Sequence, residues 1–310
     1  MEITRKGFLR LGLSAAAGGL LPPLFSRPLL GKEKGPSLPV PPDLAAVRDG
    51  SPAQMFDAGI RALGGLGRFV KKGGTVLVKP NIGWDKTPSE GATTNPDLVG
   101  RIVAAAYEAG AKKVYCFDHS VNREADCHRR SGIADAVRKN GGEMRSGEDE
   151  KAYRKAAIPG GRILKEALVH ELYLDCGAII NVPILKSHGG GRMTAALKNL
   201  MGVVWDRRFW HREDLQACIA EFPLLRKPDL NVIDAFLVMM ENGPYGATTE
   251  DLDMKKMQLL SADPVLADSA AAKVLGREPA SVLYLKRAAE LGLGSMDLKR
   301  AAIKRISLKA

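Results

Sequence analysis

The chain has 310 residues, 45% of them hydrophobic and 26% charged, a composition that excludes intrinsic disorder and allows a large buried core. Its formal net charge of +11 favours an anionic partner. Aromatic residues make up only 5%, and no recognition helix, zinc-finger spacing or aromatic stacking platform is found, so we expect a small anionic molecule as the partner and no nucleic acid.

Residues 1–30 have the order of an export signal, in which basic residues precede a mildly apolar stretch and then several prolines. The motif around Arg5, Lys6 and Phe8 resembles a twin-arginine signal in which Lys6 replaces the second arginine. We therefore expect an exported, periplasmic or extracytoplasmic protein. Glycines and prolines interrupt the apolar stretch before the roughly 20 residues of a spanning helix, so membrane contact is expected only through the uncleaved leader. Residues 31–52, rich in proline and lysine, are expected to be a linker.

Residues 53–310 are predicted to form a single α/β domain. The β-branched residues at 75–79, bounded by glycines and a proline, predict a buried strand. The next segment begins with Asn95 as a helix cap before a proline, and the helix is expected to end at Gly110. A strand at 113–118 and a helix at 133–139 then repeat this order.

A charged, glycine-rich insertion or hairpin is expected at about 141–165, with a weak strand at 156–158. Strands that alternate with helices predict a doubly wound, mostly parallel sheet with helices on both faces. The further elements expected are a helix at 166–174, a strand at 178–182, a helix at 193–200, strands at 230–238 and 256–261, and helices at 264–275 and 282–291.

Polar side chains follow the apolar strands at the points where these strands end. Because ligands bind outside the carboxyl ends of parallel strands, we expect these side chains to converge on one site. Their carboxylates suit a hard cation as well as a general base, whereas Asp263, before a proline, is expected to cap a helix. The candidate residues at the strand ends are Lys79, Asn81, Asp118, His119, Lys186, His188, Asp234 and Glu241.

Lys186 and His188 lie at a strand end that is followed by three glycines, and they are predicted to be a proton-transfer pair. Asp234 is the acidic catalytic candidate. The alternative is that Lys186 is a solvated loop residue and that His188 and Glu241 have structural roles, Glu241 in a tight turn.

Lys198 and Asn199 fall on the helix expected at 193–200, whose N-terminus favours a phosphate or carboxylate. Since its neighbours are apolar, Lys198 is expected to have an acidic partner such as Asp234 or Glu241. Residues 205–212, with three arginines and a histidine, predict either a mobile basic lid or a packed surface loop.

The four cysteines lie far apart and form neither a CxxC pair nor an iron–sulfur cluster motif, so no cluster is expected in this chain alone. Cys116 and Cys176 lie in apolar segments and are expected to be core residues. Cys127 and His128 offer only two metal ligands. The sequence pattern does not indicate which cofactor, if any, the protein binds.

Several ordered motifs between residues 74 and 306 resemble domain-of-unknown-function family 362 (DUF362), bacterial and archaeal proteins of which many are exported or fused to ferredoxin-type cluster modules. The ferredoxin module is not expected in this chain. The motifs are Val78 to Asn81, Thr94 to Pro96, Leu185 to His188, Ala196 to Gly202, Asp234-Ala235 with Glu241 to Pro244, and Ser261 to Asp268.

Two main functions follow for this exported protein. The residues at the strand ends predict binding of a small anionic ligand and an acid/base enzyme that uses Lys186 and His188. The ferredoxin-fused relatives imply the alternative, a redox or iron–sulfur or metal cofactor accessory protein that works with a redox partner protein. A passive solute-binding protein is the third interpretation, and the sequence leaves open whether the protein is an enzyme.

Overall fold

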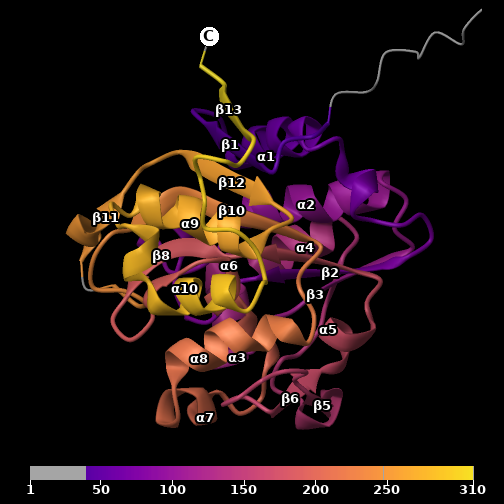
Figure 1. Cartoon of the computed structure of the whole chain (residues 1–310). Coiled ribbons are helices and arrows are strands. Elements are labelled where there is room, and N and C mark those ends of the chain that lie inside the picture. Colours follow the sequence, from indigo (N-terminus) through magenta and orange to yellow (C-terminus); the bar gives the residue numbers. More distant parts are fainter. Residues whose placement is uncertain (1–39, 247, 310) are drawn as a thin grey trace, which may run out of the picture. The chain divides into compact units, whose positions relative to one another are not determined.

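A large mixed sheet organises the computed structural model, which describes residues 40–246 and 248–309 (Figure 1). The predicted export signal and the first part of the predicted linker lie outside the described residues. From Val40 onward the chain forms one compact unit. In the described residues we find no helix long and apolar enough to cross a membrane.

The first half of the sheet is parallel, as predicted, because helices connect its strands. Its strand order is β4, β3, β2, β7, β10. These strands are β2 (Thr75–Pro80), β3 (Lys113–Cys116), β4 (Glu143–Met144), β7 (Ala178–Val182) and β10 (Leu230–Met239).

Beyond β10 the sheet becomes partly antiparallel, in the order β12 (Met257–Ser261), β1 (Leu44–Arg48), β13 (Ile303–Ser307). β12 runs antiparallel to both β10 and β1, and β13 is parallel to β1. β11 (Leu252–Asp253) is a short addition to β10. The linker prediction is therefore wrong for residues 44–48, which form a buried strand because the pattern of Leu44 to Val47 fits a sheet covered on both faces.

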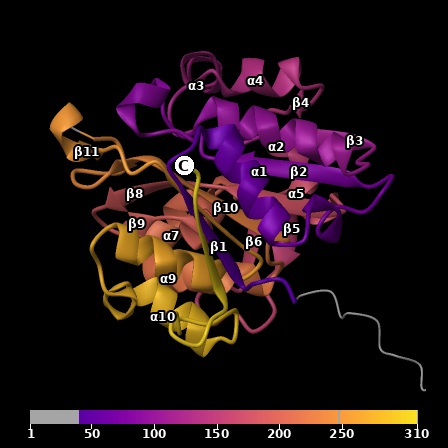
Figure 2. The ribbon, with the colours of Figure 1, turned by 90° about the horizontal axis from the view of Figure 1, so that it is seen from above.

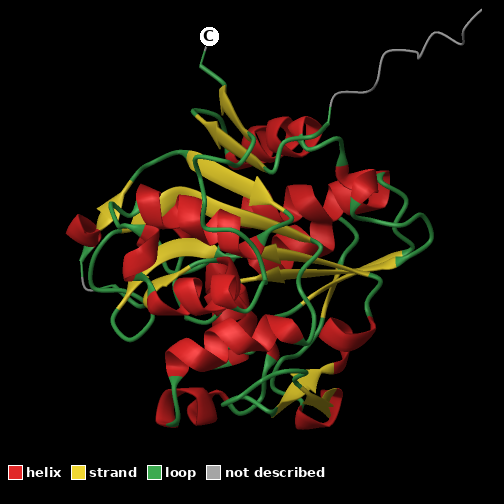
Figure 3. Ribbon diagram, viewed as in Figure 1, coloured by secondary structure: helices red, strands yellow, loops and turns green. Residues whose placement is uncertain are grey.

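Helices cover both faces of the sheet, as predicted (Figures 2 and 3). The side chains of β2 alternate between two cores: Val76 and Val78 pack against one layer, and Leu77 packs against the other. The first layer contains α1 (Pro52–Ala62), α2 (Pro96–Glu108), α3 (Glu124–Ser131) and α4 (Ile133–Lys139). The second contains α6 (Ala196–Asn199), α8 (Leu215–Glu221), α9 (Pro264–Val274) and α10 (Leu283–Glu290).

The structure corrects two predicted helices. Residues 166–174 begin as a strand, β6 (Glu166–His170), which pairs antiparallel with β5 (Tyr153–Ala157), and only α5 (Glu171–Asp175) is helical. The expected hairpin of the insertion therefore exists but extends past residue 165. Residues 193–200 are likewise divided between β9 (Arg192–Thr194) and α6, because β9 pairs with β8 (Ile184–His188).

Local capping explains where several helices begin. Asn95 accepts hydrogen bonds from the first N–H groups of α2, and Asp263 does the same for α9. The structural role predicted for Asp263 is thus confirmed. Cys116 and Cys176 are buried core residues, also as predicted.

Candidate functional site

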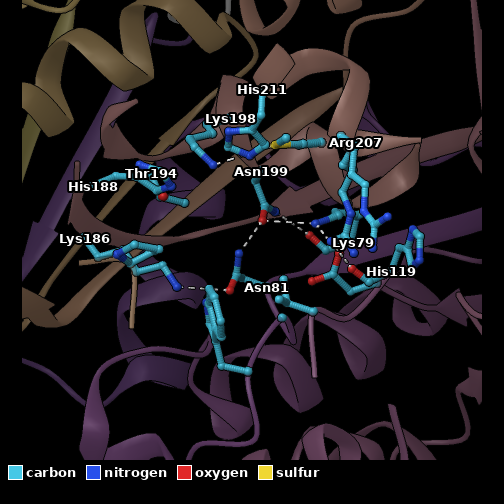
Figure 4. Close-up of a pocket in the computed structure, with 18 residues that line it drawn as sticks. Lys79, Asn81, His119, Lys186, His188, Thr194, Lys198, Asn199, Arg207 and His211 are labelled. Atoms are coloured by element: carbon cyan, nitrogen blue, oxygen red, sulfur yellow. Dashed lines mark hydrogen bonds and ion pairs between the residues drawn. The ribbon is translucent and has the colours of Figure 1, made fainter. Parts of the chain in front are cut away.

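A cavity of about 530 Å³ opens where β2, β3 and β8 end (Figure 4). Eight of the ten candidate site residues line it, so chain topology brings them together as expected. They are Lys79, Asn81, Asp118, His119, Lys186, His188, Lys198 and Asn199. The other lining residues are Gly83, Trp84, Val121, Thr194, Met201, Gly202, Arg207, Arg208, His211 and Pro244.

Lys79 and Asp118 form a buried ion pair in the cavity wall. The distance between Lys79 Nζ and Asp118 Oδ1 is 2.8 Å, and both side chains are almost completely buried. Lys79 also donates to Asn199 Oδ1 at 3.0 Å, and Asp118 Oδ2 accepts the Ile82 N–H at 2.7 Å. Burial lowers the pKa of Lys79, and the charge of Asp118 opposes this shift. Asp118 therefore neutralises Lys79 rather than a bound cation.

A row of buried amides supports this pair. Lys79, Asn181 and Asn231 are neighbours in the parallel register of β2, β7 and β10. Asn181 donates to Asn231 Oδ1 at 2.9 Å, and Asn199 donates to Asn181 Oδ1 at 2.8 Å. Asn199 is thus held between the sheet and the cavity. Sequence reasoning did not assign Asn231 to this network, although a polar residue inside an apolar strand is the signal that could have revealed it.

Lys186 is a buried lysine for which the described residues provide no carboxylate partner. Its Nζ donates to the carbonyl of Ala92 at 2.6 Å. It also donates to Asn81 Oδ1 at 3.3 Å (Figure 4). No carboxylate lies within 4.0 Å of it in the described part of the chain. Burial, with the positive charge of Lys198, lowers the pKa of Lys186 to about 7. This amine can therefore gain or lose a proton near neutral pH.

The positive charge of Lys198 has even fewer partners than that of Lys186 among the described residues. The contact found for its Nζ within the described residues is a weak one, with Met201 Sδ at 3.8 Å. Burial and the charge of Arg207 lower the pKa of Lys198 to about 8. The prediction of an acidic partner such as Asp234 or Glu241 is wrong, because neither residue lies in the cavity.

The N-terminus of α6 is already occupied by a carboxylate of the protein. Asp268, buried in α9, accepts the N–H of Ala196 at 2.6 Å and that of Leu197 at 3.1 Å. An anion bound to this helix end, as the sequence suggested, would have to displace Asp268. The contribution of α6 to the cavity is instead made by its side chains Lys198 and Asn199.

Hydrogen bonds distinguish two of the histidines that line the cavity, His188 and His119. The Gly191 N–H donates to His188 Nδ1 at 3.0 Å, so the proton of a neutral His188 is on Nε2. Burial and the charge of Lys198 lower the pKa of His188 to about 3. His119 Nδ1 lies 3.0 Å from the Val204 carbonyl and must donate to it, which leaves its Nε2 as an acceptor. His188 is consequently a hydrogen-bond donor, and the expected proton transfer through it loses support.

The segment 205–212 contributes a basic wall. It contains α7 (Arg207–Arg212), and Arg207, Arg208 and His211 line the cavity. Arg207 donates to the carbonyls of His119 and Ser120 at 2.7 and 2.8 Å, so it is packed against the loop after β3.

Two candidates do not line the cavity. Asp234 is buried, and its carboxylate accepts the N–H groups of Asn95 at 2.8 Å and Phe236 at 3.1 Å. Burial raises the pKa of Asp234 to about 6, but its contacts hold the start of α2 in place. Glu241 is exposed in the loop after β10. The structure therefore gives neither residue a place at this site.

Gly202 allows the Lys79–Asp118 pair to pack against the chain. A Cβ atom at this position would overlap Asp118 Oδ1 and lie 2.6 Å from Lys79 Nζ. Gly202→Ala is expected to lower the free energy of unfolding by about 2–4 kcal/mol, since it overpacks a buried ion pair. Urea unfolding measures this loss. The matched control is Gly67→Ala, where a Cβ would meet nothing within 4 Å, and equal losses in the two variants would contradict the prediction.

Comparisons with known proteins give a family and distant structural similarities. A family model described as a domain of unknown function (DUF362) matches residues 76–273. The thylakoid-associated protein sll1697 of Synechocystis sp. (strain ATCC 27184 / PCC 6803 / Kazusa) is 28% identical over an alignment of 250 residues, and the match covers 76% of this chain and 73% of that protein.

Two solved structures are similar at low sequence identity. The lactate racemase apoprotein from Thermoanaerobacterium thermosaccharolyticum has a TM-score of 0.43 and 9% identity, over 74% of this chain and 56% of that one. A protein from Thermotoga maritima has a TM-score of 0.47 and 12% identity, over 74% of this chain and 60% of that one. The chain thus spans less than two thirds of each.

Proposed function

The chain belongs to the DUF362 family, and from this premise we propose that it is an exported protein that binds a small anionic molecule in the cavity and exchanges a proton with it through Lys186. The signal-like order of residues 1–30, and the export that the family resemblance implies, support the first part. The cavity supports the second, because small-molecule sites are concave and contain a few converging polar groups.

The observation that carries this proposal is the charge imbalance of the cavity. Its cationic lining residues are Lys79, Lys186, Lys198, Arg207 and Arg208, whereas Asp118 is the carboxylate among the residues that line it. Lys79 already neutralises Asp118. Burying cations without counter-charges is costly, and a bound anion removes that cost.

The groups at the site divide into binding and proton-transferring roles. Lys198 and the Nε2–H of His188 offer donors to an oxyanion, and Asn81 positions the amine of Lys186. Lys186 is the proton-transferring group in this proposal, because its lowered pKa allows it to act as a base at neutral pH. Lys79 and Asn199 hold the cavity wall in shape.

The test measures ligand binding to the purified chain. A panel of phosphate, carboxylates and hydroxy acids is added, and binding is monitored by thermal unfolding and by calorimetry. We expect at least one anion to raise the melting temperature, and cations and neutral sugars to have no effect. If every anion leaves the melting temperature unchanged, the proposal fails. Iron with sulfide in protein purified without oxygen would instead support the redox accessory function.

The affinity for the anion is expected to fall as the pH rises from about 7 to about 8, where Lys186 and Lys198 lose their protons. Stability of the unliganded protein should change in the opposite direction. Unfolded Lys186 keeps its proton up to its ordinary pKa of 10.5, so above about 7 the unfolded state binds more protons and the free energy of unfolding rises with pH. Calorimetry and urea unfolding across this range check both signs, and an affinity that does not change with pH would contradict the assignment.

Export is expected to depend on the basic residues of the leader. Replacing both Arg5 and Lys6 with Gln should retain the full chain in the cytoplasm, because these residues form the charged start of the signal. Cell fractionation with an antibody against the body measures this. The control replaces Lys32 and Lys34 in the same way and should be exported normally. If the chain with an intact leader stays in the cytoplasm, the export proposal is wrong.

A further inference from the structure

The amine of Lys186 is held in a geometry that suits a nucleophile. A neutral amine has two N–H groups and one lone pair, and Lys186 has two acceptors, the Ala92 carbonyl at 2.6 Å and Asn81 Oδ1 at 3.3 Å. When both N–H groups are donated, the lone pair is the one position of the nitrogen left without a protein partner. Lys186 is one of the residues that line the cavity, so the cavity is where a ligand would meet this nitrogen. Its neutral form is accessible because burial and the charge of Lys198 lower the pKa of Lys186 to about 7.

Three donors that line the same cavity lack strong acceptors within the described residues. The ammonium of Lys198 has only the thioether of Met201 at 3.8 Å, and the Nε2–H of His188 has no partner in the described residues. The hydroxyl of Thr194 likewise makes no hydrogen bond within the part of the chain that the structure describes. Thr194 is opposite Lys186 in the β8–β9 pairing, and His188, Thr194 and Lys186 lie together in Figure 4. These groups therefore offer three unused donors to a ligand in the cavity that Lys186 also lines.

We propose that Lys186 forms an imine with a carbonyl compound that also carries an oxyanion, and that Lys198, His188 and Thr194 bind this carboxylate or phosphate. This inference rests on the proposed function, because it names the class of anion that the cavity takes. A lysine placed beside another cation in a desolvated pocket is a known arrangement for imine formation.

The step balances without a further reactant. The nitrogen lone pair attacks the carbonyl carbon and forms a C–N bond, while the carbonyl π electrons move to oxygen. The resulting carbinolamine loses its oxygen as water, whose two hydrogens come from the amine, and a C=N bond forms. No oxidant or reductant takes part, and water reverses the reaction. The imine, once protonated, withdraws electrons from the neighbouring carbon of the ligand.

Reductive trapping tests this inference. The purified full chain is incubated with pyruvate or with dihydroxyacetone phosphate in the presence of cyanoborohydride, and the adduct is located by tandem mass spectrometry. We expect a stable secondary amine on Lys186 with at least one of the two compounds, and the compound that reacts distinguishes a carboxylate from a phosphate ligand. Lactate and acetone are the matched probes: the first lacks the carbonyl and the second lacks the anion, and neither should label Lys186.

Three variants make the result specific. Lys186→Arg keeps a positive charge but should abolish the adduct, whereas Lys151→Arg, at an exposed lysine away from the cavity, should leave it unchanged. Lys198→Met should reduce the labelling rate at least tenfold while Lys186 remains available. An adduct spread over surface lysines, or none while an anion still raises the melting temperature, overturns the imine but leaves the proposed function intact. Failure of every anion to bind overturns both.

Discussion

Lys79→Met is expected to lower the free energy of unfolding by about 3–5 kcal/mol, the typical cost of removing one partner of a buried ion pair. The variant leaves the carboxylate of Asp118 buried without the ammonium 2.8 Å away, and it also removes the donor to Asn199 Oδ1. Methionine fills a similar volume, so the loss reports on charge and hydrogen bonding rather than on a cavity. Urea unfolding of the purified chain measures it.

A matched surface pair and a double variant complete this experiment. Lys113 Nζ lies 2.6 Å from Glu143 Oε2, but both side chains are well exposed, so Lys113→Met should cost at most about 1 kcal/mol. The double variant with Lys79→Met and Asp118→Asn should regain part of the stability, since the unpaired buried charge is gone. Equal losses for Lys79→Met and Lys113→Met would show that Asp118 is not buried against Lys79.

Lys198→Met is expected to weaken anion binding by about 10- to 150-fold, which corresponds to the typical 1.5–3 kcal/mol of a hydrogen bond to a charged group. The same change should leave the free energy of unfolding of the unliganded protein unchanged or raise it. The reason is that Lys198 is a partly desolvated ammonium whose contact in the described residues is a thioether. Calorimetry with the best anion of the panel and urea unfolding measure the two effects.

The opposite signs for Lys79 and Lys198 separate a structural lysine from a ligand-binding one. The control is Lys273→Met, at a surface lysine paired with Glu278, which should alter neither binding nor stability appreciably. If Lys198→Met binds the anion as tightly as the unchanged chain, Lys198 is not the anchor and the anion site must be placed elsewhere.

The location of the site could be predicted because it depends on local pattern. Apolar strands that end in polar residues placed Lys79, Asp118 and Lys186 at one edge of a parallel sheet, and the structure brings them to one cavity. The direction in which a side chain points could not be predicted from the same pattern. Asp234 also follows an apolar run, yet its carboxylate binds the backbone of Asn95 rather than the cavity.

Contacts between distant segments explain the remaining differences. The N-terminus of α6 is closed to ligands by Asp268, which follows it by about 70 residues in the chain, so no local signal could reveal it. The role of His188 depends on a backbone N–H from Gly191 that sets its tautomer. The sequence predicts a helix where residues 166–170 form a strand. The reason is that the apolar residues on either side of His170 fit both the helical and the strand periodicity.

The position of β1 has a consequence for how the protein is made. This strand, at Leu44–Arg48, lies between β12 at Met257–Ser261 and β13 at Ile303–Ser307. A ribosome must therefore synthesise nearly the entire body before either neighbour of β1 is available, and pairings of such long sequence separation form slowly. While translation proceeds, Leu44–Arg48 leaves the ribosome long before its partner strands exist, so the sheet can close around this strand only when the C-terminal strands have been made.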